Sequence, residues 1–129
     1  MTINDPEMFC KSLWDWSCLD GCFGQTKIKP TDMDGYVERH GYFIGFETKL
    51  PNVTIPDGQN ITFEKLVSSG YWTVLIAWGN PGNPIELELR TRWKTMHYQN
   101  TNLDKMRELV SKWFDWVDNQ TAAPKFEAF

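Results

Sequence analysis

The stretch TDMDGYVERHGYFIGFETK, residues 31–49, decides how this chain folds. Its pattern is typical of two strands joined by a tight two-residue turn at His40 and Gly41, and glycine suits such a turn. With that turn, Arg39 faces Tyr42, and the register of the whole hairpin is set. Directly opposed side chains share one face of a sheet, and residues two apart on a strand also share a face. The stretch therefore predicts an antiparallel hairpin with defined side-chain faces.

Four charged residues lie at matching heights on the two arms of this hairpin. The register sets Asp34 opposite Glu47, and Asp32 opposite Lys49. Two carboxylates that close repel each other unless a cation lies between them. A magnesium-dependent nuclease needs this arrangement, because carboxylates hold its divalent ion. The alternative is a solvated polar face with incidental cross-strand pairs, against which stands the apolar run of residues 42–46.

Length and composition indicate one domain over residues 1–129, with 119–129 as a loose tail. Hydrophobic residues make up 41% of the chain and aromatic residues 15%, which is enough for a core. The chain has no run of about 18 apolar residues, so no membrane span is expected. The N-terminus lacks the basic start and apolar segment of a secretory signal, so we expect a cytoplasmic protein.

Three cysteines, Cys10, Cys18 and Cys22, cluster near the N-terminus. Their odd number, without a signal peptide, indicates reduced thiols rather than disulfides. We expect them to be buried as small apolar side chains. A structural zinc is the weaker alternative, because neither histidine of the chain has a familiar zinc spacing.

A formal net charge of −4 argues against a nucleic-acid role, since nucleic-acid-binding proteins usually carry a basic footprint. Divalent ions offset the carboxylates of a metal site locally, but a basic stripe is still needed elsewhere. Two groups are candidates for phosphate contacts: Lys27 and Lys29, which approach the hairpin, and Arg90, Arg92 and Lys94, which alternate and would share a strand face. The alternative is a strand edge protected by charge.

Hydrophobic periodicity and chain-breaking residues predict the remaining elements. The first is a helix capped by Asp5 that runs towards Gly21, with Phe9, Leu13 and Trp16 on one face. A second helix over 59–69 is followed by a buried strand over 71–78 and a loop over 79–84. The last elements are a half-buried strand over 85–90, which 91–94 extend, and a helix from 101 or 102 to about 118. A hairpin followed by a helix and a buried strand implies a crossover connection. The predicted fold class is therefore α/β in the mixed α+β sense, with helices on the faces of a mixed sheet.

These motifs resemble the PD-(D/E)xK nuclease superfamily. The resemblance rests on Pro30-Thr-Asp-Met-Asp-Gly, on Phe46-Glu-Thr-Lys and on the helix and strand that follow, so it covers residues 30 to about 78. The compact form looks most like small nuclease-like proteins of bacteriophages. The resemblance implies a restriction-endonuclease-like core and a Mg²⁺- or Mn²⁺-dependent hydrolase of phosphodiester bonds, with DNA favoured over RNA and the host cytoplasm as its location.

Carried over to this chain, the resemblance implies specific roles. Asp34 and Glu47 would hold the metal together with the backbone carbonyl of Thr48, and Lys49 would position the attacking water or stabilise phosphate charge. The leading acid of the family name is here a pair of aspartates, and the hairpin register favours Asp34. Asp32 would pair with Lys49 or join a second metal.

Two further residues are secondary candidates for the same site. Gln59 opens the helix after the hairpin, where relatives often carry a glutamine or lysine, and its alternative is a plain helix-start residue. Glu7 on the first helix could supply another ligand, although compensation of the helix dipole explains it as well. The competing function is a non-catalytic protein on the same scaffold that binds nucleic acid or a host protein. A structural subunit and a homodimer are left open.

Overall fold

The computed structural model describes residues 5–120, and the chain forms two compact units, Met1–Asp32 and Met33–Phe129. The first unit contains the helix α1 (Pro6–Ser12) and a 3-10 turn, η1 (Ser17–Leu19). The second contains a five-stranded sheet with two further helices. Most of the predicted loose tail lies outside the described residues. No helix within 5–120 combines the length and apolar content that crossing a bilayer requires.

The first helix begins as predicted but is shorter. The Asp5 side chain caps α1 by accepting a hydrogen bond from the Met8 amide at 3.1 Å. The predicted continuation through Leu13 and Trp16 is wrong, because Trp16 has a left-handed backbone with φ of 65°. Just beyond, the Asp15 carboxylate accepts from the amide and hydroxyl of Ser17 at 3.0 and 2.8 Å, a local turn that competes with helix formation.

The three cysteines are free thiols, and all three are exposed, so the prediction that they are buried is wrong. The reason is that the described part of the first unit provides no core for them. Neither α1 nor η1 contains a buried residue. Free cysteines are usually buried in a hydrophobic core. Here the helix and the 3-10 turn near the cysteines are too short to form such a core.

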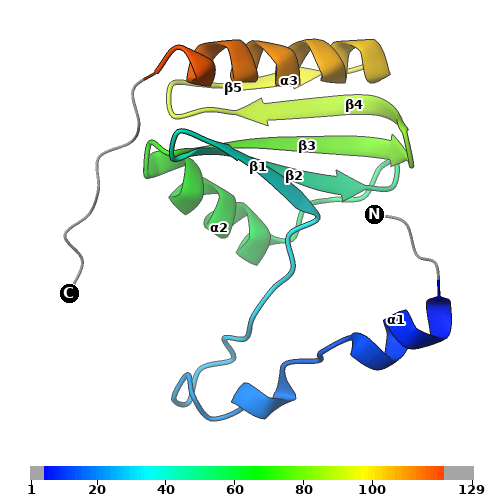
Figure 1. The fold of residues 1–129 in the computed structure, drawn as a ribbon, viewed down its shortest axis with the longest axis vertical. Helices are drawn as coiled ribbons and strands as arrows, with labels where there is room; N and C mark the ends of the chain where they lie inside the picture. Colours follow the sequence, from blue (N-terminus) through cyan, green and yellow to red (C-terminus); the bar gives the residue numbers. More distant parts are fainter. Residues whose placement is uncertain (1–4, 121–129) are drawn as a thin grey trace. The chain divides into compact units, whose positions relative to one another are not determined.

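The sheet of the second unit has the spatial order β1-β2-β3-β4-β5, and Figure 1 shows its strands between α2 and α3. The β2–β3 pair is parallel and the other three pairs are antiparallel. This confirms a mixed sheet with a crossover. The strands are β1 (Gly35–Arg39), β2 (Tyr42–Lys49), β3 (Trp72–Asn80), β4 (Asn83–Arg90) and β5 (Thr95–Tyr98).

The predicted hairpin turn is confirmed. Arg39 pairs with Tyr42, and His40 and Gly41 both have positive φ, 54° and 83°, as the favoured two-residue hairpin turn requires. The Glu38 carboxylate accepts the Gly41 amide at 2.7 Å and fixes the turn. The first strand is shorter than the sequence indicated, because β1 begins only at Gly35.

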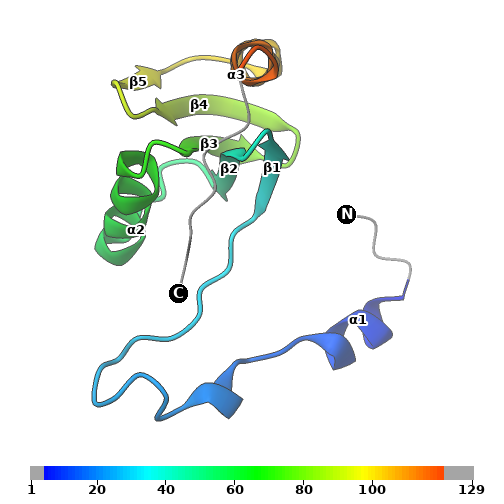
Figure 2. The same cartoon turned by 60° about the vertical axis from the view of Figure 1, so that its left-hand side comes forward.

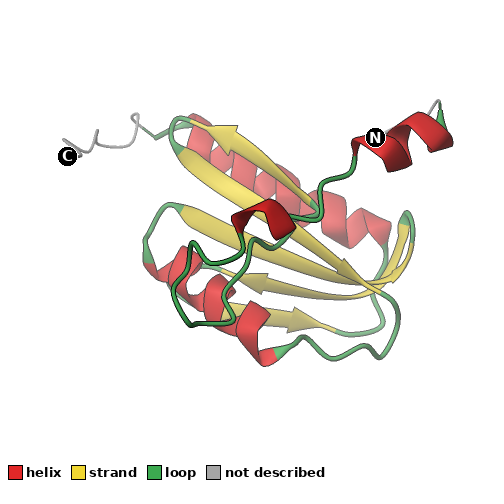
Figure 3. Ribbon diagram, turned by 90° about the horizontal axis from the view of Figure 1, so that it is seen from below, coloured by secondary structure: helices red, strands yellow, loops and turns green. Residues whose placement is uncertain are grey.

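Two helices cover opposite faces of the sheet (Figures 2 and 3). The helix α2 (Asp57–Ser68) connects β2 to β3, and α3 (Leu103–Asp118) follows β5 with Asn102 as its cap. Along β3, Leu75 and Ala77 pack in the core beneath α3, whereas the even-numbered residues between and beside them pack beneath α2. The prediction that this strand is buried on both faces is therefore confirmed.

Two predictions between residues 79 and 98 are wrong. Residues 79–84 do not form a loop, because β3 runs to Asn80 and β4 starts at Asn83. Gly79 makes this tight hairpin possible: it has φ of 157°, and a Cβ there would overlap the Asn83 carbonyl and lie 2.8 Å from the Pro84 Cα. Residues 91–94 form a turn, closed by the Thr91 amide on the Lys94 carbonyl at 2.9 Å, and lead into the unpredicted strand β5.

Candidate functional site

The hairpin places Glu47 on the sheet face that α2 covers. Glu47 lies beside Ile76 of β3, which packs in the core under α2. With 6% of its surface exposed, Glu47 is the only charged residue among 5–120 that is buried. A buried carboxylate is costly unless it is paired, so its partners decide what this position does.

Lys49 is the partner of Glu47. The two residues are two positions apart on β2, so their side chains share a face. Lys49 Nζ lies 3.4 Å from Glu47 Oε1, and the two side chains are 17% and 8% exposed. This is the most buried ion pair of the described chain, and it joins two of the residues that the sequence singled out.

Asp34 contacts the residue between them. Its Oδ2 accepts hydrogen bonds from the Thr48 amide at 2.8 Å and from the Thr48 hydroxyl at 3.0 Å. Because β1 starts at Gly35, the Asp34 carboxylate takes up a β2 amide just past the end of the β1–β2 ladder. Thr48 therefore contacts Asp34 through its amide and hydroxyl. Asp32 belongs to the first unit, as do Glu7, Lys27 and Lys29.

Gln59 lies in the first turn of α2. Phe63, four residues later, is buried against the sheet, so Gln59 lies on the same face of the helix. Its side-chain Oε1 is buried and accepts no hydrogen bond from any described residue. A buried acceptor without a donor is unfavourable, and it indicates a place where water, a cation or a ligand donor completes the structure.

A second polar cluster lies on the same face of the sheet, and it escaped the sequence analysis. In the register, Glu47 neighbours Ile76, Ile76 neighbours Glu88, and Glu88 neighbours His97 of β5. His97 Nδ1 lies 3.2 Å from Glu88 Oε1, and His97 Nε2 lies 2.6 Å from Glu86 Oε2. The alternation of β4 indicates that Glu86 and Glu88 share a face. The position of His97 beside them can be inferred only once the strand β5 is known.

The charge of this second cluster depends on pH. Partial burial alone would lower the pKa of His97, but the hydrogen bonds and charges of Glu88 and Glu86 outweigh burial and raise the pKa above its ordinary value. Arg90 completes the cluster, with Nε donating to Glu88 at 2.7 Å and a second nitrogen donating to Asn60 of α2 at 2.8 Å. The cluster thus ties β4 and β5 to the first turns of α2.

The predicted basic stripe does not form. Arg90 lies in β4 and is held by Glu88 and Asn60. Arg92 follows the strand, with its guanidinium 4.4 Å from the centre of the Trp93 ring, and Lys94 lies in the turn before β5. The three side chains do not share a strand face, because the chain turns at residues 91–94 instead of continuing straight.

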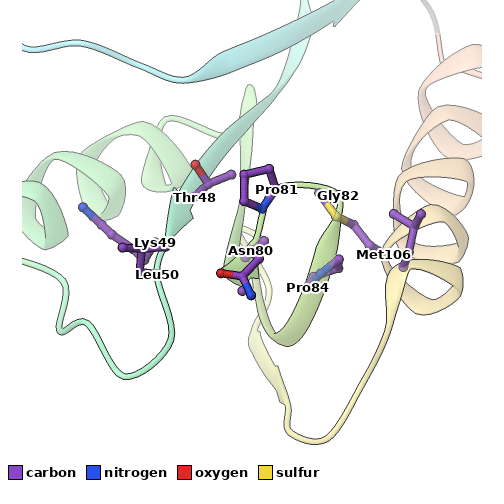
Figure 4. Close-up of a pocket in the computed structure, with 11 residues that line it drawn as sticks. Thr48, Lys49, Leu50, Asn80, Pro81, Gly82, Pro84 and Met106 are labelled. Carbon is purple, nitrogen blue, oxygen red and sulfur yellow. The ribbon is translucent and has the colours of Figure 1, made fainter.

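A cavity of about 470 Å³ lies at the carboxyl ends of the parallel strands β2 and β3. In sheets with parallel strands, ligands commonly bind at this end. The lining includes Thr48, Lys49, Asn80 and Met106 (Figure 4). In that view the Lys49 side chain extends away from Met106. The stem of Lys49 therefore borders the cavity while its ammonium pairs with Glu47.

The chain matches no family model, and no curated protein or solved structure is significantly similar to it.

Within residues 5–120, no group of three or more His, Cys, Asp or Glu side chains is arranged to hold a metal ion. The donor chemistry nevertheless fits a hard cation with few protein ligands. The contacts with Thr48 and Lys49 engage Oδ2 of Asp34 and Oε1 of Glu47, and a carboxylate has about four lone-pair sites, so both retain acceptor capacity.

Proposed function

We propose that the protein is a divalent-metal-dependent nuclease that hydrolyses phosphodiester bonds, with DNA favoured over RNA. The observation that carries this proposal is the buried Glu47–Lys49 pair at the end of a strand that borders a cavity. An apolar pair of similar volume would cost less free energy than two buried charges. The retention of two buried charges beside a cavity therefore supports a functional role.

A Mg²⁺ ion is usually bound by one or two carboxylates and several waters. In the proposed site, Asp34 and Glu47 would hold the ion with the backbone carbonyl of Thr48. When bound, the ion would lower the pKa of a water and stabilise charge on the phosphate. Lys49 Nζ lies 3.4 Å from Glu47 Oε1, where it would attract a phosphate oxygen and orient it towards the carboxylates. Gln59, with its buried acceptor, would hold a water at the same face.

The proposal includes the restriction-endonuclease-like core, which the crossover between β2 and β3 supports. We further propose that the protein is located in the cytoplasm and, as a secondary part of the proposal, that it forms a homodimer. Phosphate contacts would come from exposed cations outside the site, with Lys27, Lys29, Arg92 and Lys94 as the candidates. Each phosphate contact would release a counterion, which would favour binding of a polyanion although the chain has a net charge of −4.

The test is cleavage of labelled single- and double-stranded DNA and RNA with Mg²⁺, Mn²⁺ or EDTA. We expect metal-dependent cleavage that Glu47→Gln and Lys49→Met each reduce at least about 100-fold, a typical loss when a charge-stabilising group is removed. Glu108→Gln is the matched control, because that exposed glutamate pairs with two lysines on α3. Circular dichroism must show the three variants folded. Unchanged cleavage by both site variants would refute the proposal.

A non-catalytic binding protein is the second candidate, and one observation favours it. The first unit carries large exposed apolar side chains, including Met8, Leu13 and Trp14 at 61–69% exposure. Exposed apolar groups of this kind mark partner-binding segments. Calorimetry with Mn²⁺ separates the two functions: the nuclease requires binding that Glu47→Gln weakens, whereas the binding protein does not.

A further inference from the structure

Three aromatic side chains from neighbouring strands meet on one face of the sheet, at its β1 edge. Phe43 of β2 and Trp72 of β3 are partners in the parallel ladder. Tyr36 of β1 pairs with Gly45, which lies two residues after Phe43 on β2. Because residues two apart on a strand share a face, Tyr36, Phe43 and Trp72 lie on the same side of the sheet.

The three rings form one continuous surface, which we call the aromatic platform. The rings of Phe43 and Trp72 are stacked, with centroids 4.6 Å apart and planes 8° apart. The Tyr36 ring centroid lies 6.1 Å from that of Phe43 and 6.2 Å from that of Trp72. Gly45 leaves room for this arrangement, since a Cβ there would lie 3.2 Å from the Trp72 ring.

The platform is open to solvent. Tyr36 is 62% exposed, whereas Phe43 and Trp72 are half-buried. Neither hydrophobic core of the sheet includes these three residues, and the residues of β3 beneath α2 begin only at Val74. The Tyr36 ring therefore presents accessible aromatic surface next to two further rings, a larger feature than a single exposed side chain.

The platform and the proposed site lie on the same face of one strand. Glu47 follows Phe43 by four residues on β2, so the two share a face. At about 3.3 Å per residue, they are about 13 Å apart along the strand. Stacked nucleotides of one strand are about 3.4 Å apart, so this separation corresponds to about four nucleotides. One short nucleic-acid strand can therefore reach both.

Cations lie near the platform in both directions along the strands. Lys49 follows Glu47 on β2. Arg92 reaches the start of β3, where a Cβ on Gly70 would lie 3.5 Å from its guanidinium. Arg92 forms no ion pair within residues 5–120, so its charge is available to a phosphate.

We propose that the aromatic platform stacks unpaired bases, so that the ligand of this face is single-stranded nucleic acid. The choice of a nucleic acid rests on the proposed nuclease function. The choice of a single strand rests on the platform: in a duplex both faces of a base are covered by its neighbours, whereas an unpaired base offers a free face to an aromatic ring. Stacking is independent of charge, which suits a chain with a formal net charge of −4.

The test measures fluorescence anisotropy of a labelled single-stranded DNA of about 12 nucleotides, three times the estimated span, and of the duplex of the same sequence. The full chain is used in EDTA at fixed low salt. We expect the single strand to bind at least about tenfold more tightly than the duplex. Tyr36→Ala should weaken single-strand binding by about fivefold or more, the loss expected for one stacked base. Tyr36→Phe keeps the ring and should restore binding to within about twofold.

Val37→Ala is the matched control. Val37 is the next residue of β1, is 45% exposed and lies on the opposite face of the sheet, so its truncation should leave binding unchanged. Circular dichroism must show the three variants folded. The proposal is overturned if the single strand fails to bind at about 100 µM protein, a concentration that would populate even weak binding. Equal affinity for the duplex, or an equal loss with Val37→Ala, would overturn it as well.

The design separates this proposal from the nuclease. Binding in EDTA requires neither a metal ion nor Glu47. Single-strand binding that depends on Tyr36, without any metal-dependent cleavage, would support the platform and refute the nuclease. Cleavage that ignores Tyr36→Ala and treats both strand forms alike would do the reverse. If Tyr36→Ala instead dissociates an oligomer, the face belongs to a second copy of the chain and the platform is refuted.

Discussion

Removing the ammonium of Lys49 should destabilise the fold, because it leaves the Glu47 carboxylate buried without its partner. Lys49→Met keeps an unbranched side chain of similar length. Removing one partner of a buried ion pair costs about 3–5 kcal/mol. The pair here is 17% and 8% exposed, so water reaches it only slightly, and we take the lower end, about 3 kcal/mol.

The measurement is urea unfolding followed by circular dichroism, with the slope of the transition checked for constancy. A loss of about 3 kcal/mol corresponds to a fall in Tm of more than about 10 °C for a domain of this size. The same substitution in a Glu47→Gln background should cost at least about 1.5 kcal/mol less, because the amide does not need a cation. The exposed Glu108→Gln control should leave the transition midpoint unchanged.

Two results would refute this reasoning. A Lys49→Met variant within about 0.5 kcal/mol of the parent would mean that Glu47 is solvated well enough to lack a partner. If Lys49→Met costs the same with and without the Glu47→Gln substitution, the lysine stem and not its charge stabilises the fold. In either case the burial argument for the proposed site would lose its support.

Three further predictions concern the fold around the two faces. Gly79→Ala should destabilise by about 2 kcal/mol or more in urea unfolding, because its Cβ would overlap the Asn83 carbonyl at a φ of 157°; a neutral change would contradict the tight β3–β4 hairpin. Because the pKa of His97 is raised in the folded protein, protonated His97 stabilises the fold. This contribution is complete below the pKa of the unfolded state, near 6.5, and is lost as the pH rises through the pKa of the folded state. His97→Gln should therefore flatten the pH dependence of the unfolding free energy between about pH 6 and 8. Asn102→Ala should cost about 1 kcal/mol, because the Asn102 side chain accepts the Lys105 amide at 3.0 Å at the start of α3; no change in thermal unfolding would contradict this.

The hairpin was predictable because its turn and its two faces are local. A two-residue turn leaves one register, and His40 and Gly41 adopt the positive φ values that the turn needs. The same rule failed one step beyond the strand. Residues face each other across two strands only where both belong to the sheet. Because β1 begins at Gly35, Asp34 lies outside the strand, and its carboxylate accepts a hydrogen bond from Thr48 instead of facing Glu47. The predicted patch therefore kept Glu47 and Lys49 together, whereas Asp34 contacts Thr48, whose side chain lies on the opposite face of β2.

The amphipathic helix α3 was also predictable, since its apolar stripe and its cap are both in the sequence. The half-buried strand predicted over 85–90 is confirmed within β4, but the tight turn at 79–84 was not predictable, because glycine and proline indicate a loop and a tight hairpin equally well. The strand β5 has only four residues, too few for a clear alternation. Without β5, His97 has no position in the sheet, and its pairing with Glu86 and Glu88 cannot be read from the sequence.

The two polar clusters on the α2 face each involve a residue in the first turn of α2, Asn60 in one and Gln59 in the other. Arg90 donates to Asn60, and the neighbouring Gln59 presents its buried, unpaired acceptor to the sheet face that carries Glu47. Because Arg90 is also held by Glu88, which contacts His97, the position of the first turns of α2 depends on a hydrogen-bond chain that begins at β5. Three side-chain contacts thus link His97 to Asn60, the residue next to Gln59. The second cluster would then position the proposed site, although none of its residues belongs to that site.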